Sequence, residues 1–180
     1  SRIMQSEIGT NLPSFAAGVR NALRRHPNLT IIGEIRDAET IMAANELASS
    51  GHPLFGTTHA NSSTEIIQRL VQNFPVSQYD QVFAALVNTS RLFMSQIRVR
   101  VKDTDQMTVL RDWLYLTNED KRELLDAGYA GHVAVLRRLI QNTENARSMR
   151  TSIDQAFATG LLDDGQRLTL YKTYGEEDGI

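Results

Sequence analysis

Two short apolar segments of this chain lead to side chains that could act on a phosphate. The first, Ile31–Gly33, is followed directly by Glu34. A carboxylate at the end of an apolar strand can hold Mg²⁺, often through water, and can polarise a water molecule that attacks phosphorus. The second lies within Gly51–His59 and brings Thr57 and His59 to its end. If both segments are neighbouring strands, the residues at their ends predict phosphate hydrolysis.

Glu34 has the position of the acid in a Walker B element. The Asp that usually precedes the Glu is replaced by Gly33, so Glu34 is the sole carboxylate at the strand tip. It would then act on both Mg²⁺ and the attacking water, or on the water alone. The alternative is an ordinary acid in a strand-to-helix loop, with Asp37 capping the helix that follows.

The two histidines of the second segment do not form one metal site. His52 precedes the strand and His59 follows it, and seven extended steps separate them by about 20 Å. Ligands of open α/β sheets bind outside the carboxyl ends of the strands. His59 and Thr57 lie at that end, as Glu34 does, whereas His52 lies at the other end and is expected to be structural.

The elements that must position these residues alternate between helix and strand over the first half of the chain. Ser14 and Asp37 are suitable helix N-caps. The expected elements are a helix over 11–25, a strand over 29–35, a helix over 37–50, a strand over 53–58 and a helix that begins at 62–65. This alternation with short connections predicts a parallel α/β sheet.

The second half has a different pattern. It predicts a long helix over 78–95, an antiparallel hairpin at a sheet edge (97–101 and 107–116), and about four short helices from 118 onward. We therefore expect two domains, 1–117 with the α/β core and hairpin, and 118–180 as a helical subdomain. The acidic end of the chain, 174–180, is expected to be frayed.

Composition sets further limits. The chain has 180 residues, no cysteine and a formal net charge of −2. Without cysteine it cannot contain disulfides, thiolate zinc sites or a cysteine nucleophile. The charge balance excludes a uniformly basic nucleic-acid coat, and no apolar run is long enough for a membrane span. No charged segment followed by an apolar one opens the sequence, so no secretory signal is expected in it.

One element that phosphate chemistry usually needs is missing from this sequence. There is no Gly-rich loop of the form G-x-x-x-x-G-K-[ST], and none of the three lysines, Lys102, Lys121 and Lys172, follows a glycine loop. The backbone cradle that binds phosphates in P-loop enzymes is therefore not in this chain.

Taken together and in this order, the motifs resemble the secretion ATPases of the type II/type IV superfamily. The resemblance is strong from about residue 5 to 75 and continues more weakly to 98. The motifs that carry it are Gln5–Gly9, Val19–Pro27, the run Ile31-Ile32-Gly33-Glu34-Ile35-Arg36-Asp37-Ala38-Glu39-Thr40, and the box from Gly51-His52 to His59. Gly51-His52-Pro53 leans toward the type IVB (Dot/Icm) and plasmid-conjugation branch.

The resemblance implies a RecA-like P-loop core of which this chain is the C-terminal part, followed by a helical bundle. Glu34 matches the Walker B glutamate, which holds Mg²⁺ through water, and His59 matches the residue that senses the γ-phosphate of ATP. Thr57 lies at the same strand end. Arg36, with Asp37 and Glu39, matches residues that organise the catalytic loop and the subunit contact, although Arg36 could equally form a surface ion pair.

The resemblance also implies an assembly. Members of the family are homohexameric motors that act at the cytoplasmic face of an inner-membrane secretion or pilus complex. Their Walker A loop, Asp box and N-terminal arginine-bearing domain would lie upstream of Ser1. We therefore expect the chain to be a piece of a longer ATPase that binds nucleotide poorly by itself.

Two other functions compete with this prediction. The chain could be a non-catalytic module for ring assembly or partner docking, which the missing Walker A loop favours for the isolated chain. It could also bind nucleic acid through Arg98 and Arg100 or through Arg137 and Arg138. Arginines at alternating positions of an edge strand more simply prevent the edge from pairing, so nucleic acid is not expected as a direct ligand.

Overall fold

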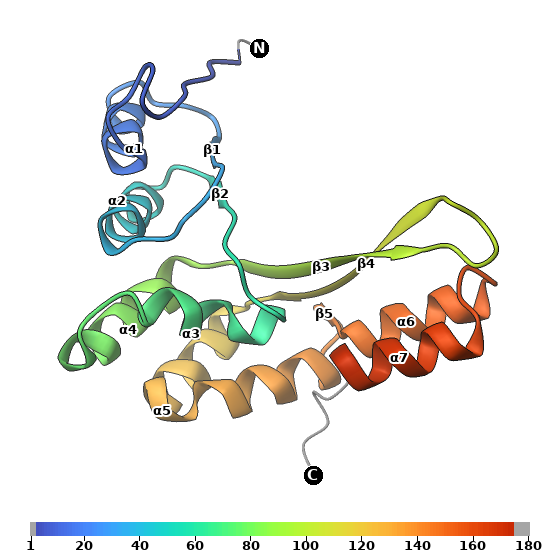
Figure 1. The fold of residues 1–180 in the computed structure, drawn as a ribbon. Helices are drawn as coiled ribbons and strands as arrows, with labels where there is room; N and C mark the ends of the chain where they lie inside the picture. Colours follow the sequence, from blue (N-terminus) through green and yellow to red (C-terminus); the bar gives the residue numbers. More distant parts are fainter. Residues whose placement is uncertain (1–2, 175–180) are drawn as a thin grey trace. The chain divides into compact units, whose positions relative to one another are not determined.

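A computed structural model describes residues 3–174, which form two compact units (Figure 1). The N-terminal unit contains the chain up to His59 together with Ile67–Thr89. The C-terminal unit contains Ala60–Ile66 and the chain from Ser90 onward. The domain boundary predicted between residues 117 and 118 does not coincide with the division into these two units, and it stays a prediction.

The N-terminal unit contains a parallel pair of short strands. These are β1 (Thr30–Ile32) and β2 (Leu54–Gly56), paired in the register Ile31 with Phe55. The helix α2 (Ala38–Ser49) connects them, and α1 (Phe15–Leu23) precedes them. The predicted alternation of helix and parallel strand is confirmed, with each strand shorter than its apolar run.

Local sequence determines where the two helices begin. Ser14 accepts a hydrogen bond from the Ala17 N–H at 3.1 Å, and Asp37 accepts one from the Thr40 N–H at 2.8 Å. Both predicted N-caps are confirmed. The first helix is shorter than the predicted 11–25, because it starts at its cap and the chain leaves it before His26, whose φ is 47°.

The core of this unit lies between its helices. Ala16 and Val19 of α1 and Ile41 and Leu47 of α2 are buried. The remaining elements are α3 (Ile66–Val71), η2 (Val76–Gln78) and α4 (Tyr79–Thr89). Helix α4 packs on α2, where the Thr89 hydroxyl donates to the Asn45 side-chain oxygen at 2.8 Å.

The predicted helix over 78–95 is too long. It ends at Thr89, and the strand β3 (Leu92–Arg100) begins three residues later. In this segment Phe93 and Ser95 are buried while Leu92 and Met94 are exposed, which is the two-residue period of a strand. The apolar residues of this segment would fit a helix as well as a strand, and the segment is a strand because it pairs with β4 (Met107–Tyr115).

The C-terminal unit is built on the predicted hairpin. The strands β3 and β4 (Met107–Tyr115) are antiparallel, with Leu92 opposite Tyr115. A two-residue strand that the sequence did not predict, β5 (Ala146–Arg147), pairs with β4 and gives the order β3-β4-β5. β3 is thus an edge strand of this sheet, as expected.

Helices follow the hairpin. They are α5 (Asn118–Asn142), α6 (Met149–Ala158) and α7 (Asp164–Tyr174), and the short η1 (Ser63–Glu65) also packs on the sheet. α5 is kinked at Gly128, whose φ of 65° lies in the left-handed region. The predicted series of helices from 118 is therefore confirmed, with β5 inserted.

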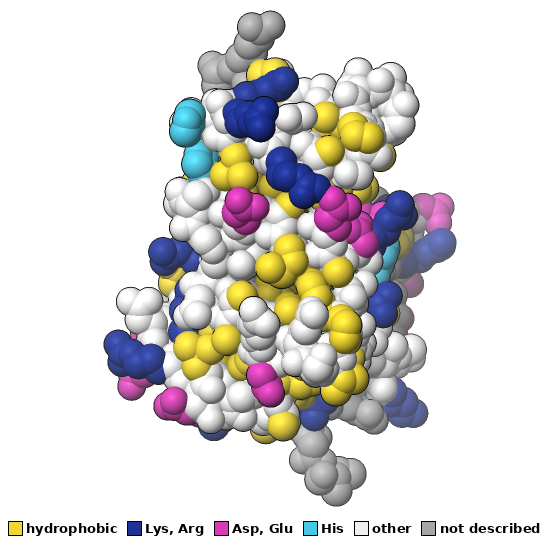
Figure 2. Space-filling view, turned by 90° about the vertical axis from the view of Figure 1, so that its left-hand side faces the viewer, with side chains coloured by type: hydrophobic (Ala, Val, Ile, Leu, Met, Phe, Trp, Pro, Cys, Tyr) yellow, Lys and Arg dark blue, Asp and Glu magenta, His cyan; other side chains and the backbone are white. Residues whose placement is uncertain are grey.

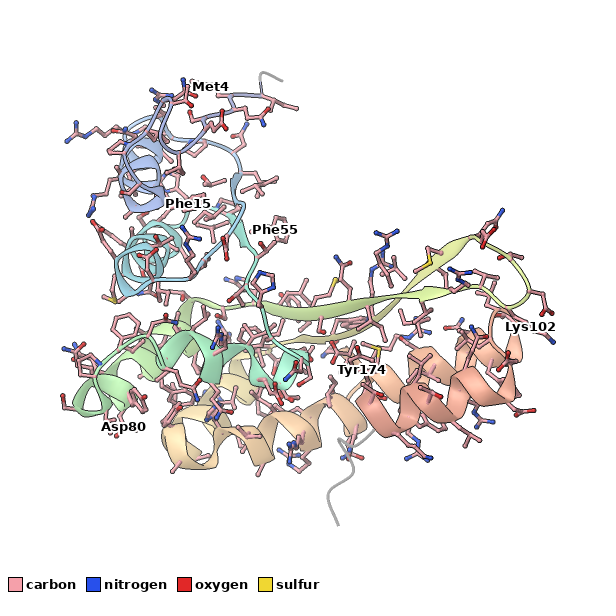
Figure 3. All side chains as sticks on the ribbon, viewed as in Figure 1. Met4, Phe15, Phe55, Asp80, Lys102 and Tyr174 are labelled. Atoms are coloured by element: carbon pink, nitrogen blue, oxygen red, sulfur yellow. The ribbon has the colours of Figure 1, made fainter. Side chains whose placement is uncertain are left out.

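One core joins the hairpin to its helices. Leu110 of β4 is buried with Met149 and Ile153 of α6, and Tyr174 at the end of α7 packs against this cluster. The hairpin tip is fixed by the Lys102 N–H, which donates to the Leu161 carbonyl at 2.8 Å. Figure 3 labels Lys102 at this tip and Tyr174 at the other end of α7.

No helix within 3–174 is both long and apolar enough to cross a membrane. The predicted frayed end, 174–180, lies outside the described residues except for Tyr174.

Candidate active site

The candidate site lies where the chain leaves β1 and β2, and backbone hydrogen bonds extend the pairing beyond both strands. The Thr57 N–H donates to the Ile32 carbonyl at 3.3 Å, and the Ile35 N–H donates to the Thr57 carbonyl at 2.7 Å. The Thr57 hydroxyl also donates to the Gly33 carbonyl. These bonds fix the loop that carries Glu34 beside the chain that leads to His59.

A close approach of side chain to backbone supports this arrangement. A Cβ placed on Gly56 would collide with the Ile35 side chain, lying 3.1 Å from its Cγ1 and nearer still to its Cδ1. Ile35 is itself 9% exposed, so it occupies the space that a larger residue at position 56 would need. Gly56 is a residue whose importance the sequence analysis did not notice.

Glu34 lies between the two cationic or potentially cationic groups of the site. One carboxylate oxygen, Oε1, is 3.8 Å from His59 Nε2, and the other, Oε2, is 3.5 Å from Arg36 Nη1. The Glu34 side chain is 35% exposed, whereas those of Arg36 and His59 are 68% and 90% exposed. The predicted residues Glu34, Arg36, Thr57 and His59 are therefore brought together at one end of the strand pair.

The predicted cap of the helix after the acidic loop is confirmed for Asp37, and the role of Glu34 stays a prediction. Both carboxylate oxygens of Asp37 are used within α2, one by the Thr40 N–H and the other by the Thr40 hydroxyl at 2.9 Å. Glu39 forms an ion pair with Arg20 of α1. Within the described chain, the recorded partners of Glu34 are side chains only, so its carboxylate has no capping role.

His52 has a structural environment at the opposite end of β2. Its ring stacks on that of His26, with centroids 5.6 Å apart, and its Nδ1 is 2.9 Å from the Ser50 hydroxyl. His59 has no such packing and is nearly fully exposed. The contrast agrees with the different roles expected for the two histidines.

The donor set at the strand ends fits Mg²⁺ that is bound largely through water. Residues 3–174 contain no cluster of three or more His, Asp or Glu side chains that could enclose an ion. Mg²⁺ in phosphate enzymes is often held by one or two carboxylates together with waters and the phosphates themselves. The single, partly exposed carboxylate of Glu34 fits that kind of binding, through water rather than in a protein cage.

A further ionisable residue, Asp112, was not noticed in the sequence. It lies on β4 in the C-terminal unit with an exposure of 0%, and its carboxylate accepts hydrogen bonds from the N–H groups of Ser95 at 2.9 Å and Ser63 at 3.2 Å. Burial raises its pKa above the usual range, and the two N–H groups oppose that rise. The alternation of Leu110, Asp112 and Leu114 along β4 could have indicated a buried acid.

Comparison with known proteins gives the class to which this α/β chain belongs. Residues 2–170 match the family described as type II/IV secretion system protein. Because this match covers nearly all of the sequence, the chain belongs to that family.

Individual relatives support the same assignment. The chain is 39% identical over 94 residues to the Escherichia coli protein YggR, covering 52% of this chain and 29% of YggR. The X-ray structure of the Legionella pneumophila ATPase DotB matches with a TM-score of 0.88 and 33% identity, over 95% of this chain and 46% of DotB. The pilus retraction motor PilT with bound ADP matches with a TM-score of 0.77 and 26% identity, over 92% and 46%.

These matches confirm the predicted RecA-like α/β fold and the secretion-ATPase family. The chain spans less than half the length of the proteins that it matches, so it corresponds to a portion of such an ATPase.

Proposed function

We propose that this chain supplies the water-activating part of the catalytic site of a motor ATPase. The observation that carries the proposal is the 3.8 Å approach of Glu34 and His59 at the ends of two paired parallel strands. In this position the Glu34 carboxylate can orient and polarise the attacking water, and the exposed His59 ring can donate to the γ-phosphate. Arg36, whose Nη1 is 3.5 Å from Glu34 Oε2, holds the carboxylate from the side opposite His59.

ATP is the proposed substrate, with Mg²⁺ held through water at Glu34. The ion would neutralise phosphate charge, while this chain's residues position the water and the γ-phosphate. Because the 180 residues contain no Walker A loop, phosphate binding would depend on residues outside this chain. The exposure of Ile31 and Phe55, at 72% and 58%, supports this, since both faces of a parallel sheet are usually covered.

The proposed setting is a homohexameric ring that is peripheral to the inner membrane on its cytoplasmic side. Such a ring would use ATP hydrolysis to drive type IV secretion, conjugative transfer or pilus dynamics through contacts with membrane-complex proteins. The likeness in structure to DotB, with a TM-score of 0.88 against 0.77 for PilT, supports the type IVB branch. The isolated chain is proposed to be inactive.

A test of the proposal uses the full-length protein that carries this chain. Glu34→Gln removes the charge of the carboxylate with little change in shape, and we expect steady-state ATP hydrolysis to fall about 100-fold or more while ATP still binds. Glu46→Gln, an exposed glutamate on α2, is the matched control and should retain wild-type turnover. Normal turnover of Glu34→Gln would contradict the assignment.

A non-catalytic role in ring assembly or partner docking is the second candidate, favoured by the missing Walker A loop. The two proposals differ in what the full-length protein does with nucleotide. A full-length protein that assembles normally but neither binds nor hydrolyses ATP would support the docking role. For the isolated chain, both proposals expect ATP to leave the melting temperature unchanged.

Nucleic-acid binding has less support. Arg100 forms an ion pair with Asp105 at 3.0 Å, and Arg98 lies on the edge strand of its sheet, where a charge prevents unwanted pairing. On the face drawn in Figure 2, basic side chains lie in small groups between acidic and hydrophobic ones rather than in one basic patch.

A further inference from the structure

Asp112 is a buried acid whose hydrogen bonds link two parts of the C-terminal unit. Its Oδ1 accepts from the N–H of Ser95 on β3, at 2.9 Å, and its Oδ2 accepts from the N–H of Ser63 at the start of η1, at 3.2 Å. Ser95 lies directly opposite Asp112 in the strand register. The carboxylate therefore joins the hairpin to a segment about fifty residues earlier in the chain.

That segment, 60–66, depends on contacts with the hairpin. Ser63 and Thr64 are each 1% exposed, and the Ser95 hydroxyl donates to the Asn61 carbonyl at 3.5 Å. The residue at the N-cap of η1, Ser62, makes no capping hydrogen bond with its side chain. Asp112 supplies, from a distant strand, an acceptor for the N–H of the first residue of η1, which has no partner within the helix.

The segment begins immediately after His59. The chain passes from the N-terminal unit to the C-terminal unit between His59 and Ala60. His59 has no packing of its own to fix it, because its ring is 90% exposed. Along the chain, His59 is joined through Thr58 to the hydrogen-bonded Thr57 on one side and to the segment 60–66 on the other.

We propose that Asp112 is a positioning residue, which holds the segment 60–66 on the hairpin and thereby fixes His59 for its contact with the γ-phosphate. The inference rests on the proposed function of His59. A carboxylate suits this task because it only accepts hydrogen bonds and offers one oxygen to each N–H, whereas the amide of Asn offers one oxygen in total.

The experiment uses the full-length protein with Asp112→Asn. Hydrogen exchange over 60–66 should become at least about tenfold faster, and ATP turnover should fall about tenfold because His59 is less well placed. The affinity for ADP, which has no γ-phosphate, should not change. Ile153→Val and Ile153→Ala, changes in the buried core of α6, serve as controls that lower the melting temperature without altering exchange over 60–66 or turnover.

A double variant separates positioning from general destabilisation. If Asp112 acts through His59, adding Asp112→Asn to His59→Ala should cause no further loss of turnover. Additive losses, or unchanged exchange over 60–66 in Asp112→Asn, would overturn the inference. If Asp112→Asn fails to fold, Ser95→Ala removes only the bond to Asn61 and should give the same changes to a smaller extent.

The failure of the proposed function would look different. In that case His59→Ala would keep wild-type turnover, and no role for Asp112 in placing His59 would stand. If His59→Ala is inactive while exchange over 60–66 is unchanged in Asp112→Asn, the inference alone is wrong.

Discussion

The ionisable side chains at the candidate site of the N-terminal unit and those in the core of the C-terminal unit lie in opposite environments. In the N-terminal unit Glu34, Arg36 and His59 lie at strand ends with substantial exposure, and backbone hydrogen bonds hold the loops that carry them. In the C-terminal unit Asp112 and His132 are buried at 0% and 1% exposure. The first arrangement suits groups that must meet a substrate, and the second suits groups that hold a fold together.

The largest effect is expected from a comparison within one segment. In the full-length protein, His59→Ala should lower ATP hydrolysis about 100-fold, because the proposed donor to the γ-phosphate is removed. His52→Ala should change turnover by about twofold or less and lower the melting temperature by a few degrees, because it loses its stacking on His26. Equal losses of activity would show that the two strand ends do not differ in function.

A smaller loss of ATP turnover should follow when the packing beneath the loop of Glu34 is disturbed while the side chains of the site are left unchanged. Gly56→Ala forces Ile35 to move, and with it the loop that carries Glu34. We expect turnover to fall about tenfold while nucleotide affinity is retained. Gly33→Ala, where a Cβ would meet nothing within 4 Å, is the matched control. If both substitutions have the same effect, the contact with Ile35 is not what positions the loop.

The buried acid of the C-terminal unit should give a pH dependence of stability. Burial raises the pKa of Asp112 in the folded state above the usual 3.8. The protonated Asp112 therefore contributes fully to the free energy of unfolding below pH 3.8, and this contribution is lost as the pH rises through the raised pKa of the folded state. Asp112→Asn should lack this component. Urea unfolding of this chain between pH 3.5 and 7 measures it, and identical profiles for both proteins would contradict the assignment.

The buried histidine should act in the opposite direction. Burial lowers the pKa of His132 below its usual 6.5, although its hydrogen bond with the Tyr129 carbonyl opposes the shift. Its contribution to stability is therefore present above pH 6.5 and declines as the pH falls below that value. The melting temperature of wild type should drop by a few degrees more between pH 7 and 5 than that of His132→Gln. An equal drop would mean that His132 does not titrate on unfolding.

The smallest effect is expected at the hairpin edge. We expect no DNA binding at low salt, measured by fluorescence anisotropy, by either the wild-type chain or the double variant Arg98→Ala with Arg100→Ala. Binding that weakens steeply with salt and disappears in the double variant would place a nucleic-acid site on the C-terminal unit.

Local sequence predicted the features whose causes are local. The caps Ser14 and Asp37, the alternation of helix and strand, and the strand-end positions of Glu34 and His59 all depend on neighbouring residues. The roles of those site residues came from the family resemblance and stay predictions until they are tested.

Features decided by distant pairing were predicted poorly. β5 has two residues and exists because it pairs with β4, and the segment from Leu92 became a strand for the same reason. Asp112 was overlooked because its partners are backbone N–H groups of Ser63 and Ser95, which no side-chain pattern indicates.

The central claim is that Glu34 activates the attacking water beside His59. Single-turnover hydrolysis of ATP by the full-length protein carrying Glu34→Gln tests it most directly, with bound ATP and ADP measured over time. We predict that ATP remains bound and uncleaved long after the wild-type protein has converted it to ADP. Cleavage of the bound ATP at the wild-type rate would contradict the claim.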